Sequence, residues 1–341
     1  MRIAVDAMGG DHAPRAIVEG AVHAARDFGV EPVLVGIPAR IEAELRRVGA
    51  GALSVQIVEA PDVIEMHEHP AMALRRKRRS SIAVAVQQVR EGHADAVVSA
   101  GHTGAAMGAG QLILGRIKGI DRPAIAAVLP TVGGRRVVLL DAGANVDCKP
   151  QHLVQFGMMG NIYAREVLGI PSPRVGLLSN GEEDIKGNDV TIHAAGILRD
   201  SDLNFVGNIE GKDLFFGLAD VVVCDGFVGN VVLKCGEGLV LAIRQIFTSE
   251  LQGWRGRLLA LYLLPLLRPA RRIWGRLDYR EHGGAPLLGI NGVCIIAHGR
   301  SNSRAIRNAI RAAMDAATHQ VPARISSAIH GEKAAALPCL R

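Results

Sequence analysis

Residues 2–35 read RIAVDAMGGDHAPRAIVEGAVHAARDFGVEPVLV, and this stretch decides the expected fold. Residues 2–5 and 32–35 are short apolar runs, which are typical of buried strands. Between them lies a glycine-containing loop at 9–11, followed at 14–28 by the apolar spacing of an amphipathic helix. A strand, a loop, a helix and a second strand are the parts of a parallel β-α-β unit.

The same order of elements recurs along the chain. Short apolar runs end in loops rich in Gly, Asp, Asn and Ser, and helical patterns follow many of them. This alternation predicts an α/β fold of parallel β-α units in three layers, with no repeat or linker that marks a domain boundary. The expected strands are residues 2–5, 32–35, 55–58, 96–99, 125–129, 137–140, 174–178, 204–206, 221–224 and 293–297. The expected helices include residues 14–28, 82–91, 152–167, 190–199 and 303–319.

Composition narrows the class of protein. An apolar fraction of 49% over 341 residues allows a large buried core, which excludes intrinsic disorder. The longest apolar run, residues 258–267, is shorter than the roughly 20 residues that a membrane-spanning helix needs. Five cysteines without a CxxC pair predict reduced thiols in a cytosolic protein. Asp6 and Asp11 stand where a signal peptide would be apolar, so none is expected.

The net charge of +6 is concentrated in two patches. Residues 254–276 hold six arginines and no acidic residue, and residues 75–79, RRKRR, add five positive charges. The rest of the chain therefore has a net charge of −5, which is the total of +6 less the +6 and +5 of the two patches. We expect a mildly acidic body with two basic patches, each of which needs its own explanation.

Six glycine-containing loops follow predicted strands. Ligands of open α/β sheets bind outside the carboxyl ends of the strands. Glycine there lets backbone N–H groups approach an anion, and a following helix N-terminus adds a favourable dipole. The pattern predicts an anion-binding cleft, and the alternative is a compact fold in which glycine serves tight turns. The loops are residues 9–11, 99–104, 141–145, 179–181, 225–230 and 298–301.

Several motifs in these loops carry a family resemblance. The chain resembles the bacterial phosphate acyltransferase family in order from Met1 to about Arg304. The resemblance implies a three-layer α/β/α fold like that of the isocitrate and isopropylmalate dehydrogenases and of phosphotransacetylase. It also implies a single catalytic α/β unit over residues 1–341, with two lobes around a cleft, and a cytoplasmic homodimer. The motifs are MRIAVDAMGGDHAP, RRKRRSS, SAGHTGA, GRIKGIDRPAI, LLDAGANVDCKP, GEEDIKG and CDGFVGNVVLK.

The activity that the resemblance implies is the formation of acyl phosphate from acyl-acyl-carrier-protein and inorganic phosphate, for glycerophospholipid synthesis. Such a reaction needs positive charge and N–H donors for phosphate, and a group that stabilises the oxyanion of the tetrahedral intermediate. Phosphate is itself the nucleophile, so the chemistry requires no covalent enzyme intermediate. No metal or other cofactor is expected.

Four residues are the catalytic candidates: Lys186, Asn188, Asp225 and Asn230. Lys186 lies between glycines in a loop after a strand, where it can reach phosphate or the oxyanion. The alternative is a solvated lysine paired with a nearby glutamate. Asn188 offers a neutral donor beside it. Asp225 and Asn230 are expected to bracket a turn, in which Asp225 orients Lys186 or a phosphate proton, or instead accepts from turn N–H groups.

The candidates for phosphate and substrate binding lie in the other loops. His102 replaces the asparagine usual in the family, and it is not assigned as a general base because its charge would depend on pH. Arg300 replaces a small polar residue, and it either adds a phosphate contact or is exposed. Asp11 also has the alternative role of capping a helix that starts at Pro14. The full set is Asp6, Gly9, Gly10, Asp11, Ser99, Gly101, His102, Thr103, Gly104, Asn145, His298 and Ser301.

The RRKRR patch is the candidate surface for an acidic acyl carrier protein. It leads into Ser80 and Ser81, either of which is a natural N-cap, so basic side chains and helix N–H groups converge there. The alternatives are a solvated basic turn or a nucleic-acid site. Nucleic acid is not expected as a partner, because the patch lacks the interleaved aromatic residues of a single-strand binder. The candidates are Arg75, Arg76, Lys77, Arg78, Arg79, Arg116 and Lys118.

Residues 250–280 are expected to form a protruding amphipathic helical tip. Arginine and tryptophan suit the headgroup layer of a membrane, and leucine suits the shallow acyl region. A peripheral contact with the cytoplasmic membrane would bring the acyl phosphate to a glycerol-3-phosphate acyltransferase there. The alternatives are a dimer interface or a helical core. The candidate membrane residues are Trp254, Leu258, Leu261, Leu264, Leu267, Arg271, Arg272 and Trp274.

Three other functions stay open on the sequence. A CoA-dependent phosphotransacetylase would share the fold, but the RRKRR patch favours a protein carrier. A non-enzymatic membrane or nucleic-acid adaptor would use the two basic patches, but it would leave the glycine loops without a purpose. A nicotinamide dehydrogenase of the related fold is also conceivable, although the chain has no GxGxxG fingerprint after a strand.

Overall fold

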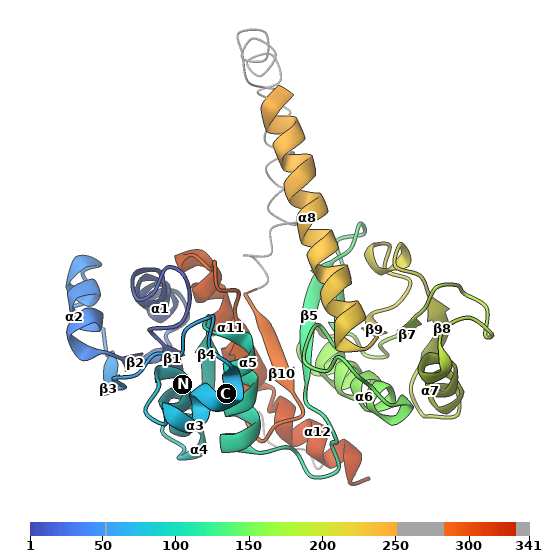
Figure 1. The fold of residues 1–341 in the computed structure, drawn as a ribbon, viewed down its shortest axis with the longest axis horizontal. Helices are drawn as coiled ribbons and strands as arrows, with labels where there is room; N and C mark the ends of the chain where they lie inside the picture. The colour runs from blue at the N-terminus through green and yellow to red at the C-terminus, as the bar shows by residue number, and fades with distance from the viewer. Residues whose placement is uncertain (52, 251–282, 332–341) are drawn as a thin grey trace.

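One mixed β-sheet forms the centre of the computed structural model, which describes residues 1–51, 53–250 and 283–331 (Figure 1). Within these residues the sheet has 11 strands in the order β3-β2-β1-β4-β11-β10-β5-β6-β9-β7-β8. The strands are β1 (Arg2–Asp6), β2 (Glu31–Gly36), β3 (Gln56–Glu59), β4 (Ala96–Ser99), β5 (Ala124–Pro130), β6 (Arg136–Leu140), β7 (Val175–Leu178), β8 (Phe205–Ile209), β9 (Val221–Val223), β10 (Ala285–Leu288) and β11 (Val293–Ile296).

The sheet consists of two parallel blocks joined by antiparallel strands. Strands β1 to β4 and β11 pair in parallel, and so do β6 to β9, which confirms the predicted β-α units. The prediction was wrong for the middle of the sheet, where β5 pairs antiparallel with both β6 and β10, and β10 with β11. Only short loops separate β5 from β6 and β10 from β11, and short loops join antiparallel neighbours.

Helices cover both faces of the sheet, so the predicted three-layer arrangement is confirmed. The first face packs against α1, α6 and α11, whose Ile17, Phe156 and Ile306 are fully or almost fully buried in one apolar cluster. The second face packs against α4 and α5 in a separate cluster. The helices are α1 (Arg15–Phe28), α2 (Pro38–Arg47), α3 (Pro70–Arg76), α4 (Ser81–Arg90), α5 (Thr103–Ala109), α6 (Pro150–Glu166), α7 (Asp189–Arg199), α8 (Gly226–Glu250), α11 (Ser303–Thr318) and α12 (Val321–Ile329), with short helical turns η1 (Gly110–Leu114) and η2 (Asp213–Phe215).

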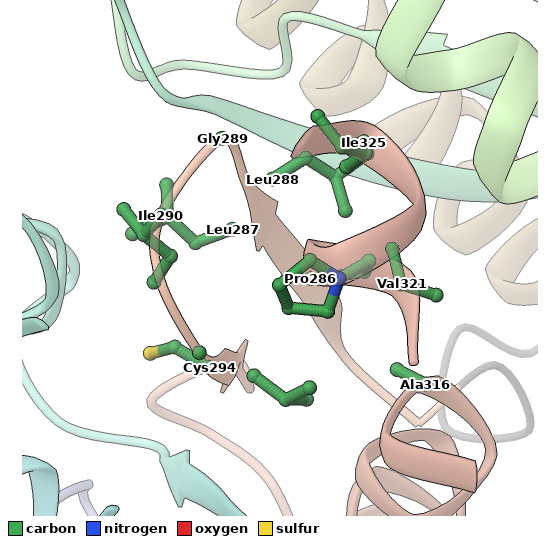
Figure 2. A pocket seen from close by; sticks show the side chains of 12 residues that line it. Pro286, Leu287, Leu288, Gly289, Ile290, Cys294, Ala316, Val321 and Ile325 are labelled. Carbon is green, nitrogen blue, oxygen red and sulfur yellow. The ribbon is translucent and has the colours of Figure 1, made fainter. Parts of the chain in front are cut away.

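A small void lies where α12 packs on the end of β10 (Figure 2). Its volume is about 10 Å³, and side chains such as Pro286, Leu288, Val321 and Ile325 line it. A space of this size holds at most one water molecule, and apolar walls offer that water no partners. The void is therefore a feature of packing and not a ligand site.

Ser80 occupies the N-cap position of α4, as predicted, but its buried hydroxyl has no hydrogen-bond partner within the described residues. The alternative role of Asp11 as a helix cap was wrong. Asp11 does not cap α1, because the residue at the N-cap position is Pro14 and no side chain caps that helix. Tertiary packing of the two helices replaces the local hydrogen bonds that their sequences suggested.

Helix α8 begins where the sequence predicted a turn. The carboxylate of Asp225 accepts a hydrogen bond from the backbone N–H of Val228 at 2.9 Å, as a helix cap does, and Asn230 lies inside the helix. The helix projects away from the rest of the molecule (Figure 1). Several of its apolar side chains are exposed, among them Phe227, Val231, Leu239, Leu241 and Ile246.

The stretch Gly226–Ile246 has the length and composition of a membrane-crossing helix, with a mean hydropathy of 1.5 and 11% of its window buried. One such helix is weak evidence of a span, and its first turns line the cavity described below. The predicted tip at residues 250–280 lies almost wholly outside the described residues, which end at Glu250 and resume at Gly283. The division of residues 1–341 into two lobes and a tip stays a prediction.

Candidate active site

Three of the six glycine loops meet at one edge of the sheet. β1, β4 and β11 are neighbouring parallel strands, so the loops that follow them lie side by side. The N–H of Asp11 donates to the carbonyl of Gly299 at 2.8 Å, which joins the first loop to the last. A methyl group on Gly9 would lie 2.5 Å from the Asp6 carboxylate and 2.7 Å from the nitrogen of Gly101, so only glycine fits there. The loops at 9–11, 99–104 and 298–301 thus come together as predicted.

Asp6 and Ser99 hold these loops from inside the protein. The Ser99 hydroxyl donates to the Asp6 carboxylate at 2.7 Å and accepts from the N–H of Gly101 at 3.1 Å. Both side chains are almost completely buried. Burial raises the pKa of Asp6, although hydrogen bonds from Ser81, Ser99 and two backbone N–H groups act to lower it. The structure therefore places Asp6 and Ser99 under the loops, where they position backbone groups.

His102 sits at the N-cap of α5. Its Nδ1 accepts a hydrogen bond from the N–H of Gly104 at 3.1 Å. The next residue, Thr103, is exposed and lines the cavity described below. Of this motif, Gly101 and Thr103 line that cavity.

A second buried carboxylate, Asp141, organises the loop on the other side of the site. It accepts hydrogen bonds from the N–H groups of Ile125, Gly143, Ala144 and Asn145 at 2.7–3.2 Å. Burial raises the pKa of Asp141 in spite of these bonds, which lower it. Asp141 was not among the predicted site residues, although a charged residue directly after a buried strand is a signal for such a role.

Asn145 completes this loop and connects it to α8. Its side-chain amide donates to the carbonyl of Pro123 and to the Asp141 carboxylate, both at 2.8 Å. Its carbonyl accepts from the N–H of Gly226 at 2.7 Å. The amide group of Asn145 is thus engaged inside the loop, and the start of α8 is fixed against it.

A cavity of about 490 Å³ lies between these two sides. Its polar wall includes Asp11, Gly101, Thr103 and residues 298–301 from the first side. The other walls come from β5, from Phe215 and from α8, which contributes the predicted Asn230. The volume lies within the range of small-molecule sites, and the cavity sits at the carboxyl ends of parallel strands. It is the candidate active site.

Lys234 is the amine at the wall of this cavity. Its Nζ lies 2.8 Å from the Glu237 carboxylate and 3.3 Å from Nε2 of His298. Nδ1 of His298 accepts from the N–H of Arg300 at 3.1 Å, which leaves Nε2 as the nitrogen that faces Lys234. Burial and the Lys234 charge lower the pKa of His298, so the ring is neutral at neutral pH. A cation and a neutral imidazole therefore stand side by side at the polar end of the cavity.

Lys186 and Asn188 lie elsewhere at the same edge of the sheet. They follow β7, which pairs in parallel with β9, the strand that leads into α8. Lys186 is exposed, and the Asn188 side chain caps α7 by accepting from the N–H of Thr191 at 2.9 Å. Neither residue lines the cavity. Their catalytic roles, like those of Asp225 and Asn230, stay predictions.

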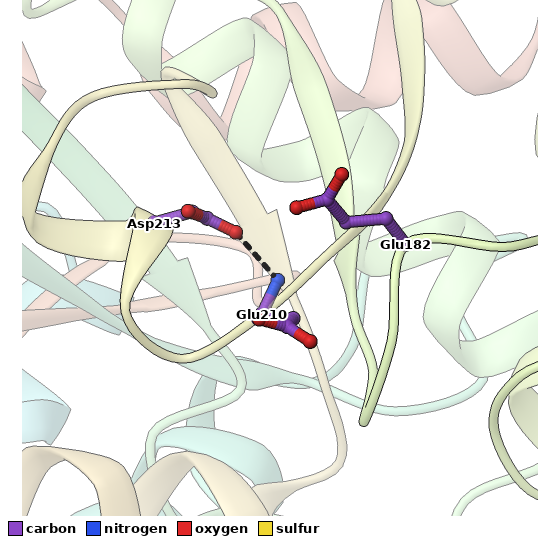
Figure 3. Close-up of side chains that lie close together, drawn as sticks. All are labelled: Glu182, Glu210 and Asp213. Atoms are coloured by element: carbon purple, nitrogen blue, oxygen red, sulfur yellow. Dashed lines mark hydrogen bonds between the residues drawn. The ribbon is translucent and has the colours of Figure 1, made fainter.

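Three carboxylates gather near this loop: Glu182, Glu210 and Asp213 (Figure 3). The Lys212 amine forms an ion pair with Glu210 and lies 3.9 Å from Glu182. The Asp213 carboxylate accepts from the N–H of Glu210 at 3.0 Å. The charge and the hydrogen-bonding capacity of the cluster are thus largely used within the protein, and we assign no metal to it.

The RRKRR patch lies at the end of α3. Arg75, Arg76, Arg78 and Arg79 are exposed, and Lys77 forms an ion pair with Glu68 at 2.6 Å. Arg116 donates to the carbonyl of Asp121 in a separate loop after η1, and Lys118 in that loop is exposed. Arg79 also forms an ion pair with the exposed Glu59 at 3.6 Å. The exposed arginines are within reach of an acidic partner, and the predicted carrier site stays a prediction. The predicted membrane residues, from Trp254 to Trp274, lie outside the described residues.

The architecture is shared with enzymes that transfer acyl groups to phosphate. A phosphotransacetylase from Streptococcus pyogenes aligns with a TM-score of 0.64 and 18% identity over 93% of this chain and 94% of its own. A branched-chain phosphotransacylase from Enterococcus faecalis V583 aligns with a TM-score of 0.60 and 15% identity over 94% and 99%. The protein therefore has the phosphotransacetylase-like α/β fold that the sequence resemblance implied.

Sequence similarity then gives the family. Residues 1–324 match the family described as "Fatty acid synthesis protein". A "Phosphate acyltransferase" from Pelotomaculum thermopropionicum is 57% identical over 96% of this chain and 95% of its own, and one from Heliobacterium modesticaldum is 54% identical over 97% and 98%. The chain belongs to the phosphate acyltransferase family, and it is a phosphate acyltransferase of fatty acid and phospholipid synthesis, as the motifs predicted.

Proposed function

We propose that this enzyme forms an acyl phosphate from an acyl-acyl-carrier-protein thioester and inorganic phosphate, in a reversible reaction that supplies glycerophospholipid synthesis. The observation that carries the proposal is the cavity, which has donors for an anion at one end and apolar walls beside them. The names of the relatives support the acyl transfer to phosphate, and the exposed arginines of the RRKRR patch support an acidic carrier.

The reaction balances without a covalent enzyme intermediate. A phosphate oxygen attacks the thioester carbonyl, the new C–O bond gives a tetrahedral oxyanion, and the C–S bond then breaks to release the carrier thiolate, which takes up a proton. Two of the described thiols near this part of the fold, Cys148 and Cys224, are poor nucleophiles. Burial raises the pKa of Cys148 to about 12 and also raises that of Cys224, so both stay protonated at neutral pH.

The position of Lys234 supports a role for its amine in binding phosphate or stabilising the oxyanion. Lys234 is the cationic side chain whose amine contacts His298, and both groups lie at the polar end of the cavity. Thr103 lines the same cavity, and its hydroxyl is a further possible donor, whereas the N–H of Gly101 already donates to Ser99. The Lys234 amine is about half exposed and paired with Glu237, so a bound substrate would have to compete with that carboxylate for it.

The test is the release of carrier thiol from a purified acyl-carrier thioester with and without inorganic phosphate. We expect release to depend on phosphate and an acyl phosphate to appear in equal amount. Hydrolysis at the same rate in both samples would contradict the proposal. In this assay an adaptor without enzymatic activity would release no thiol at all.

A CoA-dependent phosphotransacetylase is the second candidate, and the fold shared with phosphotransacetylases favours it. The same assay separates the two functions when acyl-CoA replaces the acyl-carrier thioester. We expect a higher kcat/KM for the carrier thioester than for acyl-CoA. The kcat/KM for the carrier thioester should fall as the salt concentration rises, because salt screens the arginines of the RRKRR patch. A higher kcat/KM for acyl-CoA would favour the second candidate.

We further propose that the enzyme is a homodimer at the cytoplasmic face of the membrane, with residues 254–276 as the membrane contact. The exposed apolar side of α8, which leads toward that segment, supports both parts of the proposal. The protein is expected to float with anionic vesicles at low salt, and replacement of Leu258, Leu261 and Leu264 by serine should abolish flotation. Equal flotation of both proteins would exclude the segment as the contact.

A further inference from the structure

The larger part of the cavity is an apolar chamber that the anion chemistry does not use. Ala127 and Leu129 of β5 point to the same face of the sheet, because side chains alternate along a strand. The ring of Phe215 lies against Gly236 of α8, and Leu233 and Val240 of α8 complete the walls. We call these six residues the apolar chamber.

The chamber is continuous with the polar end of the cavity. Leu233 directly precedes Lys234 on α8, and Gly236 and Val240 follow it on the next turns. From Leu233 to Val240 the helix rises about 10 Å, so the chamber runs alongside α8 for about that length. Any thioester whose carbonyl lies near Lys234 must place its carbon chain in adjoining space, and the chamber is the adjoining space with apolar walls.

Two residues fix the width of the chamber. The Cζ atom of the Phe215 ring lies 3.3 Å from the position that a Cβ atom on Gly236 would take. The absence of a side chain at Gly236 therefore leaves space for the ring. The backbone of Phe215 is held by its carbonyl, which accepts from the N–H of Val132 at 2.9 Å. Ala127 is 6% exposed and has the smallest side chain on the β5 wall. A larger residue there would fill the chamber from the side of the sheet.

We propose that the apolar chamber holds the acyl chain of the thioester, and that Phe215 and Ala127 set which chain lengths it accepts. This inference rests on the proposed function, since it names the place of one substrate group in that reaction. A saturated acyl chain fits the chamber by its chemistry: it offers no hydrogen bonds, and the chamber walls demand none. Each methylene buried there strengthens binding by a factor of about four.

The test compares kcat/KM for butyryl, octanoyl, lauroyl and palmitoyl carrier thioesters. We expect kcat/KM of the wild type to rise with chain length until the chamber is full. Ala127→Leu should lower the value for the long chains by roughly tenfold or more relative to butyryl. Phe215→Ala should shift the preference toward longer chains. Phe216→Ala is the matched control, because this neighbouring ring is 67% exposed and does not line the cavity.

Activity with the butyryl thioester shows that each variant is folded. Binding of a fluorescent fatty acid is the second readout, and Ala127→Leu should weaken it whether or not the enzyme turns over. Loss of phosphate-dependent thiol release with every thioester, together with altered fatty-acid binding, would refute the proposed function and leave the chamber assignment standing. Chain-length profiles and fatty-acid binding of Ala127→Leu and Phe215→Ala that match those of Phe216→Ala would overturn the assignment.

Discussion

Replacing Lys234 by glutamine is expected to lower kcat by about 10²- to 10³-fold, with a much smaller change in the KM for the carrier thioester. Lys234 places a positive charge at the polar end of the cavity, where the negative charge of the tetrahedral intermediate develops. Loss of one preorganised donor to an oxyanion has an effect of this size. Steady-state kinetics of the phosphate-dependent thiol release measures it.

Two lysine variants serve as comparisons. Lys212→Gln is the control, because Lys212 is paired with Glu210 outside the cavity, and its kcat should be unchanged. Lys186→Gln tests the lysine that the sequence motif favoured. A severe loss in Lys186→Gln combined with normal turnover in Lys234→Gln would transfer the catalytic role to Lys186.

The pKa of His298 gives a readout that does not depend on turnover. Burial and the Lys234 charge both hold this pKa below its ordinary value. Removal of the charge in Lys234→Gln should therefore raise the pKa of His298, as an NMR titration of the ring would measure. An unchanged pKa in the folded variant would show that the two groups do not interact.

Asp141→Asn is expected to lower the free energy of unfolding by about 3 kcal/mol, the upper range for hydrogen bonds to a charged group. The Asp141 carboxylate accepts from four backbone N–H groups in a buried position. An amide has one oxygen, and its NH₂ group would face N–H donors, so at least one of these donors loses its partner. Chemical denaturation measures the difference.

Asp147→Asn is the matched control for this prediction. Asp147 lies in the same segment of chain, but it is exposed, so its replacement should change the free energy of unfolding by less than about 0.5 kcal/mol. Equal stabilities of the two variants would show that the Asp141 carboxylate is not what holds the loop. Activity should fall together with stability in Asp141→Asn, because the loop also fixes the start of α8 through Asn145.

The sequence predicted most strands, because buried parallel strands are apolar runs bounded by glycine and polar residues. It did not predict β10, whose four residues include Pro286. It also did not predict the start of α8, where Gly226 and Gly229 resemble turn residues. They serve close packing instead: a methyl group on Gly229 would lie 1.9 Å from the carbonyl oxygen of Asp141. Proximity of this kind depends on the tertiary structure, so local patterns do not reveal it.

The sequence likewise predicted only part of the candidate site. The loops at residues 9–11, 99–104 and 298–301 meet because β1, β4 and β11 are neighbours in the sheet; parallel strands were expected, but their order in the sheet was not predicted. Lys234 is the last residue of the motif CDGFVGNVVLK. Because residues 225–230 were expected to form a turn, the sequence did not indicate that Lys234 lies beside the other cavity residues. Once α8 is helical, Asn230, Lys234 and Glu237 lie at spacings of four and three residues and share one face. This periodicity was the available signal.

The position of β10 and β11 has a consequence for how the protein is made. β4 and β5 follow each other closely in the chain, yet in the sheet they are separated by β11 and β10, which come from residues 285–296. During synthesis the block of strands β1 to β4 therefore cannot join the block of strands β5 to β9 in one sheet until this late hairpin has left the ribosome. Because the hairpin inserts between the two sides of the cavity, the nascent chain must reach residue 301 before it can assemble a site. Contacts of such long sequence separation are slow to form, and each unfinished half exposes an open strand edge in the meantime.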